Sequence, residues 1–317
     1  MRVALIALLL APALVWAEPS TVIIYDAIGR ANAITIEGRV VEAEQRSAAT
    51  SDDPWWKNLW RNARKMFVSE RERTAVALVL HGETLHARGD EEGHFRIDHI
   101  PVSAIPHGWH EVTATGAGLS GRGKALVVPP TQPHGLISDV DDTVLVSDVT
   151  DKSRLLKNMF LKNPEQRAAF PGTAAFYAQL AARNADSVTA PLIYLSASPR
   201  HLAPNIRAFL DKQGFPRGVL LTKQISGNNK DPLLDQERYK IERIEALLAA
   251  LPWVTFTLIG DDGERDPEIY RTIAERHPQR VAAIYIRRVH PDPVRARYPG
   301  QRDLAEAISQ STRRESL

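Results

Sequence analysis

Two aspartates spaced two residues apart follow an apolar stretch, in His134-Gly-Leu-Ile-Ser-Asp139-Val-Asp141-Asp142-Thr143-Val144. In an extended chain alternate side chains share a face, so Asp139 and Asp141 can converge at the C-terminal end of a strand, where open α/β sheets bind their ligands. Two carboxylates there repel unless a cation or a shared proton intervenes. The pattern therefore indicates Mg²⁺ binding or acid–base chemistry, and a plain Asp-rich turn is the structural alternative.

A second signal lies where a later apolar stretch, Ala190-Pro-Leu-Ile-Tyr-Leu-Ser196, runs through Ala-Ser198-Pro-Arg200 into a predicted helix that stops at Gly214. A hydroxyl beside the first free amide groups of a helix makes an anion-binding site. An ordinary helix N-cap would also explain the serines.

A third signal follows the predicted strand 254–259, where the chain reads Gly260-Asp261-Asp262-Gly263-Glu264-Arg265-Asp266-Pro267. A glycine that permits a sharp turn, with carboxylates at both ends of a tight loop, suits Mg²⁺. Asp266 with Pro267 also fits the N-cap and first turn of a helix. Upstream, Lys240 lies near the start of a predicted helix over 235–251, one residue before its first buried position. From there its side chain can reach over the edge of the sheet.

Taken in chain order, these stretches resemble the signatures of the haloacid-dehalogenase phosphotransferase superfamily. The first signature is D-x-D-x-T and the last is G-D-x-x-x-x-D. Ile137–Val144 and Leu258–Tyr270, supported by Tyr194–Pro199, look like the actin-patch-associated phosphatidate phosphatase family and its bacterial relatives. The resemblance covers residues 134 to about 290. Two positions depart from the family's pattern. Arg200 stands where an aromatic residue often follows Ser-Pro, and Tyr239 stands where His often precedes the lysine.

The resemblance implies phosphoryl transfer through an aspartyl-phosphate. Asp139 would be the nucleophile and Asp141 the general acid and base. Thr143, Ser196 and Lys240 would bind the phosphate, and Thr143 would also hold the first loop in register. Ser198 is the alternative to Ser196, and Lys223 and Lys230 are the alternatives to Lys240. Mg²⁺ would be held by Asp139, the backbone carbonyl of Asp141, Asp261 and Asp266.

These residues need a scaffold, and strands alternate with helices from His134 onward. That alternation predicts a parallel sheet with helices on both faces, which the resemblance makes a haloacid-dehalogenase-like Rossmannoid domain over 131–317. An apolar cluster within 146–170 suggests a small insertion over the site.

Residues 18–130 instead show short strands with turns, predicted at 21–25, 33–37, 38–41, 74–80, 94–98 and 125–128. The pattern predicts a smaller β-sandwich. Its segment Ala87–Phe95 looks like a hairpin of transthyretin-like or prealbumin-like modules, with Phe95 facing inward. Pro129-Pro130-Thr-Gln-Pro133 is a stiff linker.

A Trp-rich helix is predicted at about 51–67, with apolar positions 56, 59, 60, 63 and 67 on one face. Packing on the sandwich or the second domain is the favoured interpretation, and peripheral membrane contact is the alternative. An Arg-rich stretch near the C-terminus could face phospholipid head groups, although we favour water; it contains Arg287, Arg288, Arg295, Arg297 and Arg302.

Residues 1–17 combine one positive charge, an apolar run and a final Ala17, which predicts a cleaved signal peptide. The run is short for a membrane span. Cysteine is absent, so no disulfide supports the fold, and we expect export to the periplasm of a Gram-negative bacterium. A formal charge of +2 gives no sign of nucleic-acid binding.

These features, with the function that the resemblance implies, predict a Mg²⁺-dependent phosphomonoester phosphatase that acts on phosphatidate or another lipid phosphate. One alternative keeps the chemistry and makes the substrate a soluble periplasmic phosphomonoester. Another is a non-catalytic binding module whose sandwich carries the function.

Overall fold

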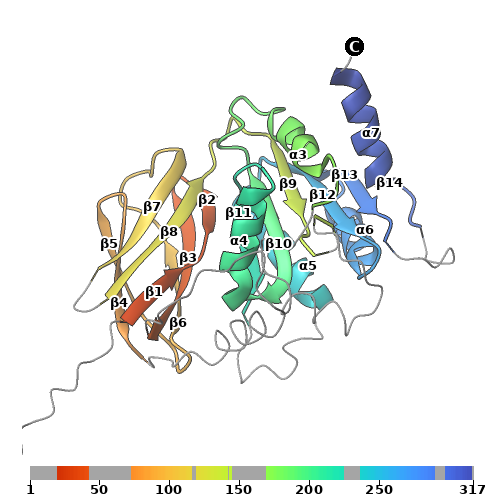
Figure 1. The fold of residues 1–317 in the computed structure, drawn as a ribbon. Coiled ribbons are helices and arrows are strands. Elements are labelled where there is room, and N and C mark those ends of the chain that lie inside the picture. The colour runs from red at the N-terminus through yellow and green to blue at the C-terminus, as the bar shows by residue number, and fades with distance from the viewer. Residues whose placement is uncertain are drawn as a thin grey trace, which may run out of the picture.

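The chain forms a β-rich half and an α/β half, each built on its own sheet (Figure 1). The computed structural model describes residues 20–42, 73–115, 119–141, 143–144, 169–224, 236–289 and 297–315. The predicted α/β class is confirmed. The haloacid-dehalogenase-like and transthyretin-like assignments of the two halves stay predictions.

In the described part of the chain, the α/β half is organised around six parallel strands. Their spatial order is β11 (Val219–Lys223), β10 (Leu192–Pro199), β9 (His134–Ser138), β12 (Thr255–Asp261), β13 (Val281–Arg287) and β14 (Gln301–Asp303). The middle strands are apolar and almost wholly buried, as expected for a parallel sheet covered on both faces. This order places the C-terminal ends of β9 and β12 side by side.

Helices cover both faces of this sheet. Alternate residues of one strand enter different hydrophobic clusters: Leu258 packs with α5 and α6, and Ile259 packs with the helices of the opposite face. One face carries α5 (Gln236–Ala250) and α6 (Asp266–Arg276), and the other carries α3 (Thr173–Ala181), α4 (Ala203–Lys212) and α7 (Leu304–Glu315). A short 3-10 turn, η2 (Arg200–Leu202), joins β10 to α4.

Among the residues that the structure describes, the β-rich half contains eight strands that pair mostly antiparallel. They are β1 (Ser20–Ile24), β2 (Ala27–Arg30), β3 (Ala33–Glu42), β4 (Ala75–Leu80), β5 (Glu83–Arg88), β6 (His94–His99), β7 (Gly108–Thr115) and β8 (Leu119–Val127). The segments predicted at 33–37 and 38–41 form the single strand β3. Because β1 pairs with both β3 and β8, the sheet folds back on itself around a core of its own.

The hairpin predicted over 87–95 is wrong, although Phe95 is buried as expected. Strand β5 pairs with β4, and β6 pairs with β3 instead. The physical reason is the turn at His81 and Gly82, which both have positive φ, a geometry that favours a two-residue hairpin. That turn commits β5 to β4, so the acidic loop at 89–93 becomes a crossing between strands.

The two halves pack directly on each other. Leu126 and Val128 of the β-rich half belong to the same buried cluster as α5, and the Trp109 indole donates to the carbonyl of Val188 at 3.0 Å. Asp26 forms an ion pair with Arg207 of α4 across the same interface. The predicted domain boundary near residue 130 falls between β8 and β9, and stays a prediction because the halves share one hydrophobic cluster.

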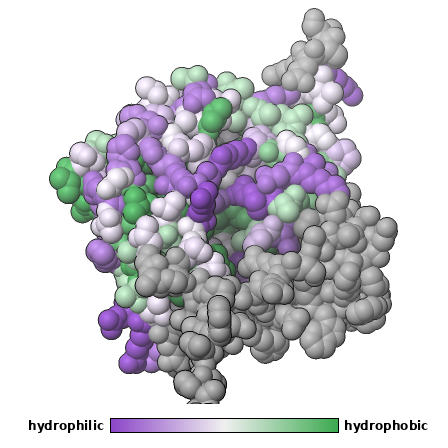
Figure 2. Space-filling view, turned by 60° about the vertical axis from the view of Figure 1, so that its left-hand side comes forward, coloured by the Kyte–Doolittle hydropathy of each residue, from purple (hydrophilic) through white to green (hydrophobic). Residues whose placement is uncertain are grey.

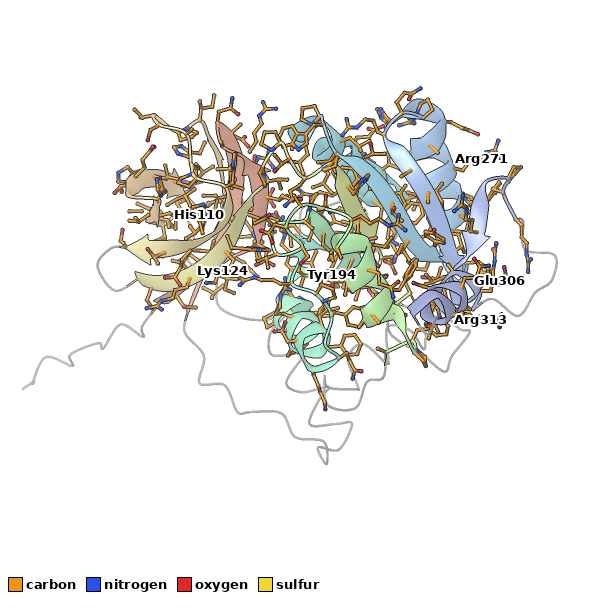
Figure 3. The ribbon with its side chains drawn as sticks, turned by 90° about the horizontal axis from the view of Figure 1, so that it is seen from above. His110, Lys124, Tyr194, Arg271, Glu306 and Arg313 are labelled. Carbon is orange, nitrogen blue, oxygen red and sulfur yellow. The ribbon has the colours of Figure 1, made fainter. Side chains whose placement is uncertain are left out.

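The outer surface is mixed in character. Seen from the side of the β-rich half, hydrophilic side chains gather around a hollow near the middle of the face (Figure 2). From above, His110 and Lys124 lie on the β-rich half, Tyr194 lies centrally, and Arg271 and Arg313 lie at the far end (Figure 3).

Several predicted segments lie outside the described residues, namely 1–17, the Trp-rich segment 51–67, nearly all of the insertion at 146–170, and Lys230. Within the part of the chain that the structure describes, no helix combines the length and apolar character needed to cross a membrane.

Candidate active site

Three carboxylates meet at the C-terminal ends of β9 and β12. The backbone amide of Asp139 donates to the carbonyl of Ile259 at 2.8 Å, which continues the pairing of the two strands beyond β9. Asp139 and Asp261 therefore leave the sheet side by side, and Asp266 returns to them at the start of α6. Among the described residues, these three each offer one oxygen within 4.8 Å of the others.

The loop between β12 and α6 is held by its own carboxylates. Asp261 Oδ1 accepts from the amide of Gly263 at 2.8 Å, and Asp266 Oδ2 accepts from the amide of Asp261 at 3.3 Å. A Cβ on Gly260 would lie 2.4 Å from Asp266 Oδ2, so only glycine lets Asp266 approach so closely.

Lys240 is buried among these carboxylates. It is 1% exposed, and its Nζ lies 2.9 Å from Asp139 Oδ1 and 2.5 Å from Asp266 Oδ1. Glu264, which the sequence analysis did not single out, approaches the same ammonium at 3.7 Å. Lys223, the predicted alternative to Lys240, lies at the end of β11 near the ring of Tyr239.

With all three carboxylates ionised, the charges of this cluster do not balance. Burial raises the pKa of Asp139 well above its ordinary value, and Asp266 and Asp261 raise it further, while Lys240 opposes the shift. Asp139 Oδ2 is buried and has no hydrogen-bond partner among the described residues. Three buried carboxylates face one ammonium, so a divalent cation would balance the two remaining charges. The oxygen ligands and the orphaned Oδ2 fit Mg²⁺.

Asp141 is held by two hydroxyl groups on the neighbouring strand. Its Oδ2 accepts from Ser196 Oγ at 2.8 Å and from Ser198 Oγ at 2.7 Å. Both predicted serines therefore contact Asp141, which puts its carboxylate against β10 and outside the cluster of three. A carboxylate held by two donors, beside a carboxylate with an unpaired oxygen, suits proton transfer next to a nucleophile.

Thr143, predicted to bind phosphate, donates from Oγ1 to Asp261 Oδ2 at 3.0 Å and is fully buried. Its amide also donates to the carbonyl of Asp141 at 2.7 Å. Thr143 thus ties the first loop to a candidate metal ligand.

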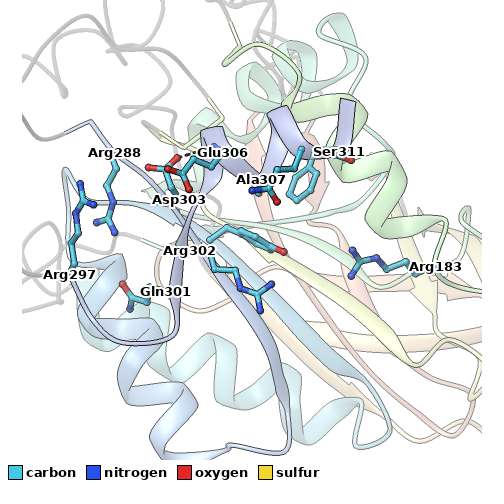
Figure 4. Close-up of a pocket in the computed structure, with 12 residues that line it drawn as sticks. Arg183, Arg288, Arg297, Gln301, Arg302, Asp303, Glu306, Ala307 and Ser311 are labelled. Carbon is cyan, nitrogen blue, oxygen red and sulfur yellow. Dashed lines mark hydrogen bonds between the residues drawn. The ribbon is translucent and has the colours of Figure 1, made fainter. Parts of the chain in front are cut away.

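Part of the predicted Arg-rich stretch lines a pocket of about 590 Å³ beside α7 (Figure 4). Arg288, Arg297 and Arg302 contribute to it, together with Arg183, two residues after the end of α3, and the carboxylates of Asp303 and Glu306. Arg288 also lies 3.5 Å from Asp262, the residue after Asp261. The pocket is therefore adjacent to the candidate site and separate from it.

The buried carboxylates at the C-terminal ends of the central strands could hold a metal ion, at the edge where open α/β sheets bind their ligands. Residues 134–288 match the family model described as the catalytic domain of phosphatidate phosphatase APP1.

Two curated proteins are also similar to this chain. Phosphatidate phosphatase APP1 of Saccharomyces cerevisiae is 34% identical over 155 residues, which cover 48% of this chain and 25% of the yeast protein. An uncharacterized protein of Schizosaccharomyces pombe is 26% identical over 210 residues, covering 63% of this chain and 34% of its own. The chain thus spans only a quarter to a third of the length of these relatives.

Among solved structures, a carbohydrate acetylesterase from Xanthomonas citri is 12% identical with a TM-score of 0.31, covering 86% of this chain and 67% of its own. This similarity is too low to support a conclusion about fold or function.

Proposed function

We propose that the protein is a Mg²⁺-dependent phosphomonoester phosphatase that acts through an aspartyl-phosphate on Asp139, with phosphatidate or another lipid phosphate as substrate. The observation that carries this proposal is the buried Asp139, paired with Lys240 and flanked by Asp261 and Asp266. It lies inside the stretch that matches the APP1 catalytic-domain family model.

In the first step, an oxygen of Asp139 bonds to phosphorus and the bond from phosphorus to the leaving alkoxide breaks. Asp141 gives its proton to that alkoxide. In the second step Asp141 takes a proton from water as the water oxygen attacks phosphorus, which releases inorganic phosphate and restores Asp139. The hydroxyls of Ser196 and Ser198 hold the carboxylate of Asp141 throughout.

Charge on the phosphoryl oxygens must be met by fixed positive groups. Lys240 supplies one, next to Asp139. Mg²⁺ bound by Asp139, Asp261 and Asp266, with the carbonyl of Asp141, would neutralise the carboxylates and polarise the phosphoryl group.

The test is a panel of phosphatidate, lysophosphatidate and soluble phosphomonoesters, assayed for phosphate release with Mg²⁺ and with a chelator. We expect Mg²⁺-dependent release that is absent in Asp139→Asn and retained in Asp211→Asn, a control at an exposed position of α4. Preference for a soluble substrate would support the alternative phosphatase. Release that is equal in wild type and Asp139→Asn, or absent for every substrate, would contradict the proposal.

We also propose export to the periplasm, on the strength of the apolar run within residues 1–17. The mature chain is then expected to begin near Glu18. N-terminal sequencing of protein recovered from the periplasmic fraction tests this, and retention of Met1 would contradict it.

A further inference from the structure

The side chain of Glu37, in the β-rich half, contacts the α/β half. It lies in β3 with 18% of its side chain exposed, and it forms ion pairs with Arg200 and, at 3.4 Å, with Arg243. Arg96, from its own half, donates to it at 2.9 Å. One carboxylate of the β-rich half thus meets guanidinium groups on two separate elements of the α/β half.

The first of these elements is the turn that leaves β10. Arg200 comes two residues after Ser198, whose hydroxyl holds Asp141. Its side chain is 7% exposed. The guanidinium contacts Glu37, the ring of Tyr25 at 4.5 Å, and the carbonyl of Thr222, which accepts from Nε at 3.3 Å. Two of these three partners belong to the β-rich half.

The second element is α5. Arg243 lies one helical turn after Lys240, which contacts Asp139. Glu37 is therefore bonded close to both of the groups that hold the two central carboxylates: the serines on Asp141 and the lysine on Asp139.

The electrostatics require a charged Glu37. Burial raises its pKa, but Arg200 and Arg243 together bring that pKa below the ordinary value. Ion pairs that are largely buried add little net stability compared with apolar packing. Their hydrogen-bond geometry instead fixes the relative positions of the elements that carry them.

We propose that Glu37 is a positioning residue of the active site, which makes the β-rich half a required part of the catalytic unit. This rests on the proposed function. Glu37 acts through Arg200 and Arg243, which set the position of the serine turn and of Lys240. A misplaced group costs rate even when the reacting residues are intact.

The interface offers a matched control. Asp26 also reaches from the β-rich half, to Arg207 of α4 and to the amide of Leu220, but neither partner holds a candidate site residue. Asp26→Asn and Glu37→Gln thus each remove one interfacial carboxylate charge, and only the second disturbs the site.

We expect Glu37→Gln to lower kcat by about 10-fold to 100-fold, the range for residues that orient catalytic ligands, with a much smaller change in KM. Asp26→Asn should keep kcat near the wild-type value at a comparable loss of thermal stability. Arg200→Gln should lower kcat similarly, and the double variant Glu37→Gln, Arg200→Gln should be no slower than Arg200→Gln alone. If Glu37→Gln does not fold, Arg243→Gln removes the ion pair between Arg243 and Glu37 and keeps the pair between Glu37 and Arg200, and we expect it to lower kcat as well.

Binding of orthovanadate with Mg²⁺, measured by calorimetry, separates this proposal from the proposed function. A wild type that binds orthovanadate without hydrolysing any phosphomonoester would contradict the function alone, and weaker binding only in Glu37→Gln would still support the positioning role. Equal kinetics and equal orthovanadate affinity in Glu37→Gln and Asp26→Asn would overturn it.

Discussion

At the scale of single residues, Lys240 stabilises the cluster of buried carboxylates when no metal is bound. Burial alone would lower its pKa, but the carboxylates of Asp139 and Asp266 raise it well above the ordinary value. The lysine therefore stays charged and offsets part of the repulsion among three buried acids.

Lys240→Met should destabilise the metal-free protein strongly, because it leaves buried carboxylates without their counter-charge. Breaking a buried ion pair from one side costs about 3 to 5 kcal/mol, and Mg²⁺ should restore part of it. Urea unfolding with chelator and with Mg²⁺ measures both effects. Lys124→Met, which removes an exposed pair with Glu111, should cost little. Equal losses in the two variants would contradict the buried cluster.

The two central carboxylates should respond differently to amide substitution. Asp139→Asn should abolish turnover and any trapped phospho-adduct, since an amide is a very poor nucleophile. Asp141→Asn keeps the nucleophile, so a substrate with a good leaving group should give a burst without steady turnover. Rapid-quench kinetics checks this, and equal residual turnover without a burst in either variant would mean that the roles are misassigned.

At the scale of elements, the junction of β12 with α6 depends on one missing side chain. A Cβ on Gly260 would lie only 2.4 Å from Asp266 Oδ2. The loop can therefore bring Asp266 back to Asp261 only if residue 260 is glycine.

Gly260→Ala should displace Asp266, weaken Mg²⁺ binding and cost about 1 to 3 kcal/mol of stability through overpacking. Gly135→Ala on β9 is a suitable control, because its Cβ would meet Phe256 at 2.4 Å and crowd the core away from the carboxylates. Calorimetric Mg²⁺ titration should show weaker binding only in Gly260→Ala. Wild-type Mg²⁺ affinity in that variant would contradict the argument.

The elements also show where sequence reasoning works. Apolar runs ending in carboxylates were sufficient to predict β9 and β12, and the order of the motifs was sufficient to propose Asp139, Asp261 and Lys240. Strand β5 was missed because it buries little beyond Leu85. Glu37 was missed because its partner Arg200 is 163 positions away, and no local pattern links the two.

At the scale of the whole molecule, the buried His94 of the β-rich half makes the stability of the protein depend on pH. His94 is buried at the start of β6, and burial, with Arg39 and Arg200 nearby, lowers its pKa to about 4. In the unfolded chain the imidazole takes up a proton near pH 6.5.

Between about pH 6.5 and pH 4 only the unfolded chain binds this proton, so stability is full above that window and falls as pH falls through it. The loss should be on the order of 2 kcal/mol after allowance for solvent screening. Urea unfolding across this range should show a shallower decline in His94→Gln than in wild type. Parallel curves would contradict a neutral buried His94.

The position of Asp26 has a further consequence for solubility. Among the described strands, β11 lies at one end of the parallel sheet. An uncovered edge strand presents free amides on which another chain can assemble. Asp26 accepts from the amide of Leu220 on that edge at 3.0 Å, and Arg207 bonds both Asp26 and the carbonyl of Gly218. The β-rich half thus shields the open edge of its neighbour. A fragment of residues 131–317 would expose the edge of β11. We therefore expect this fragment to aggregate through strand pairing at that edge.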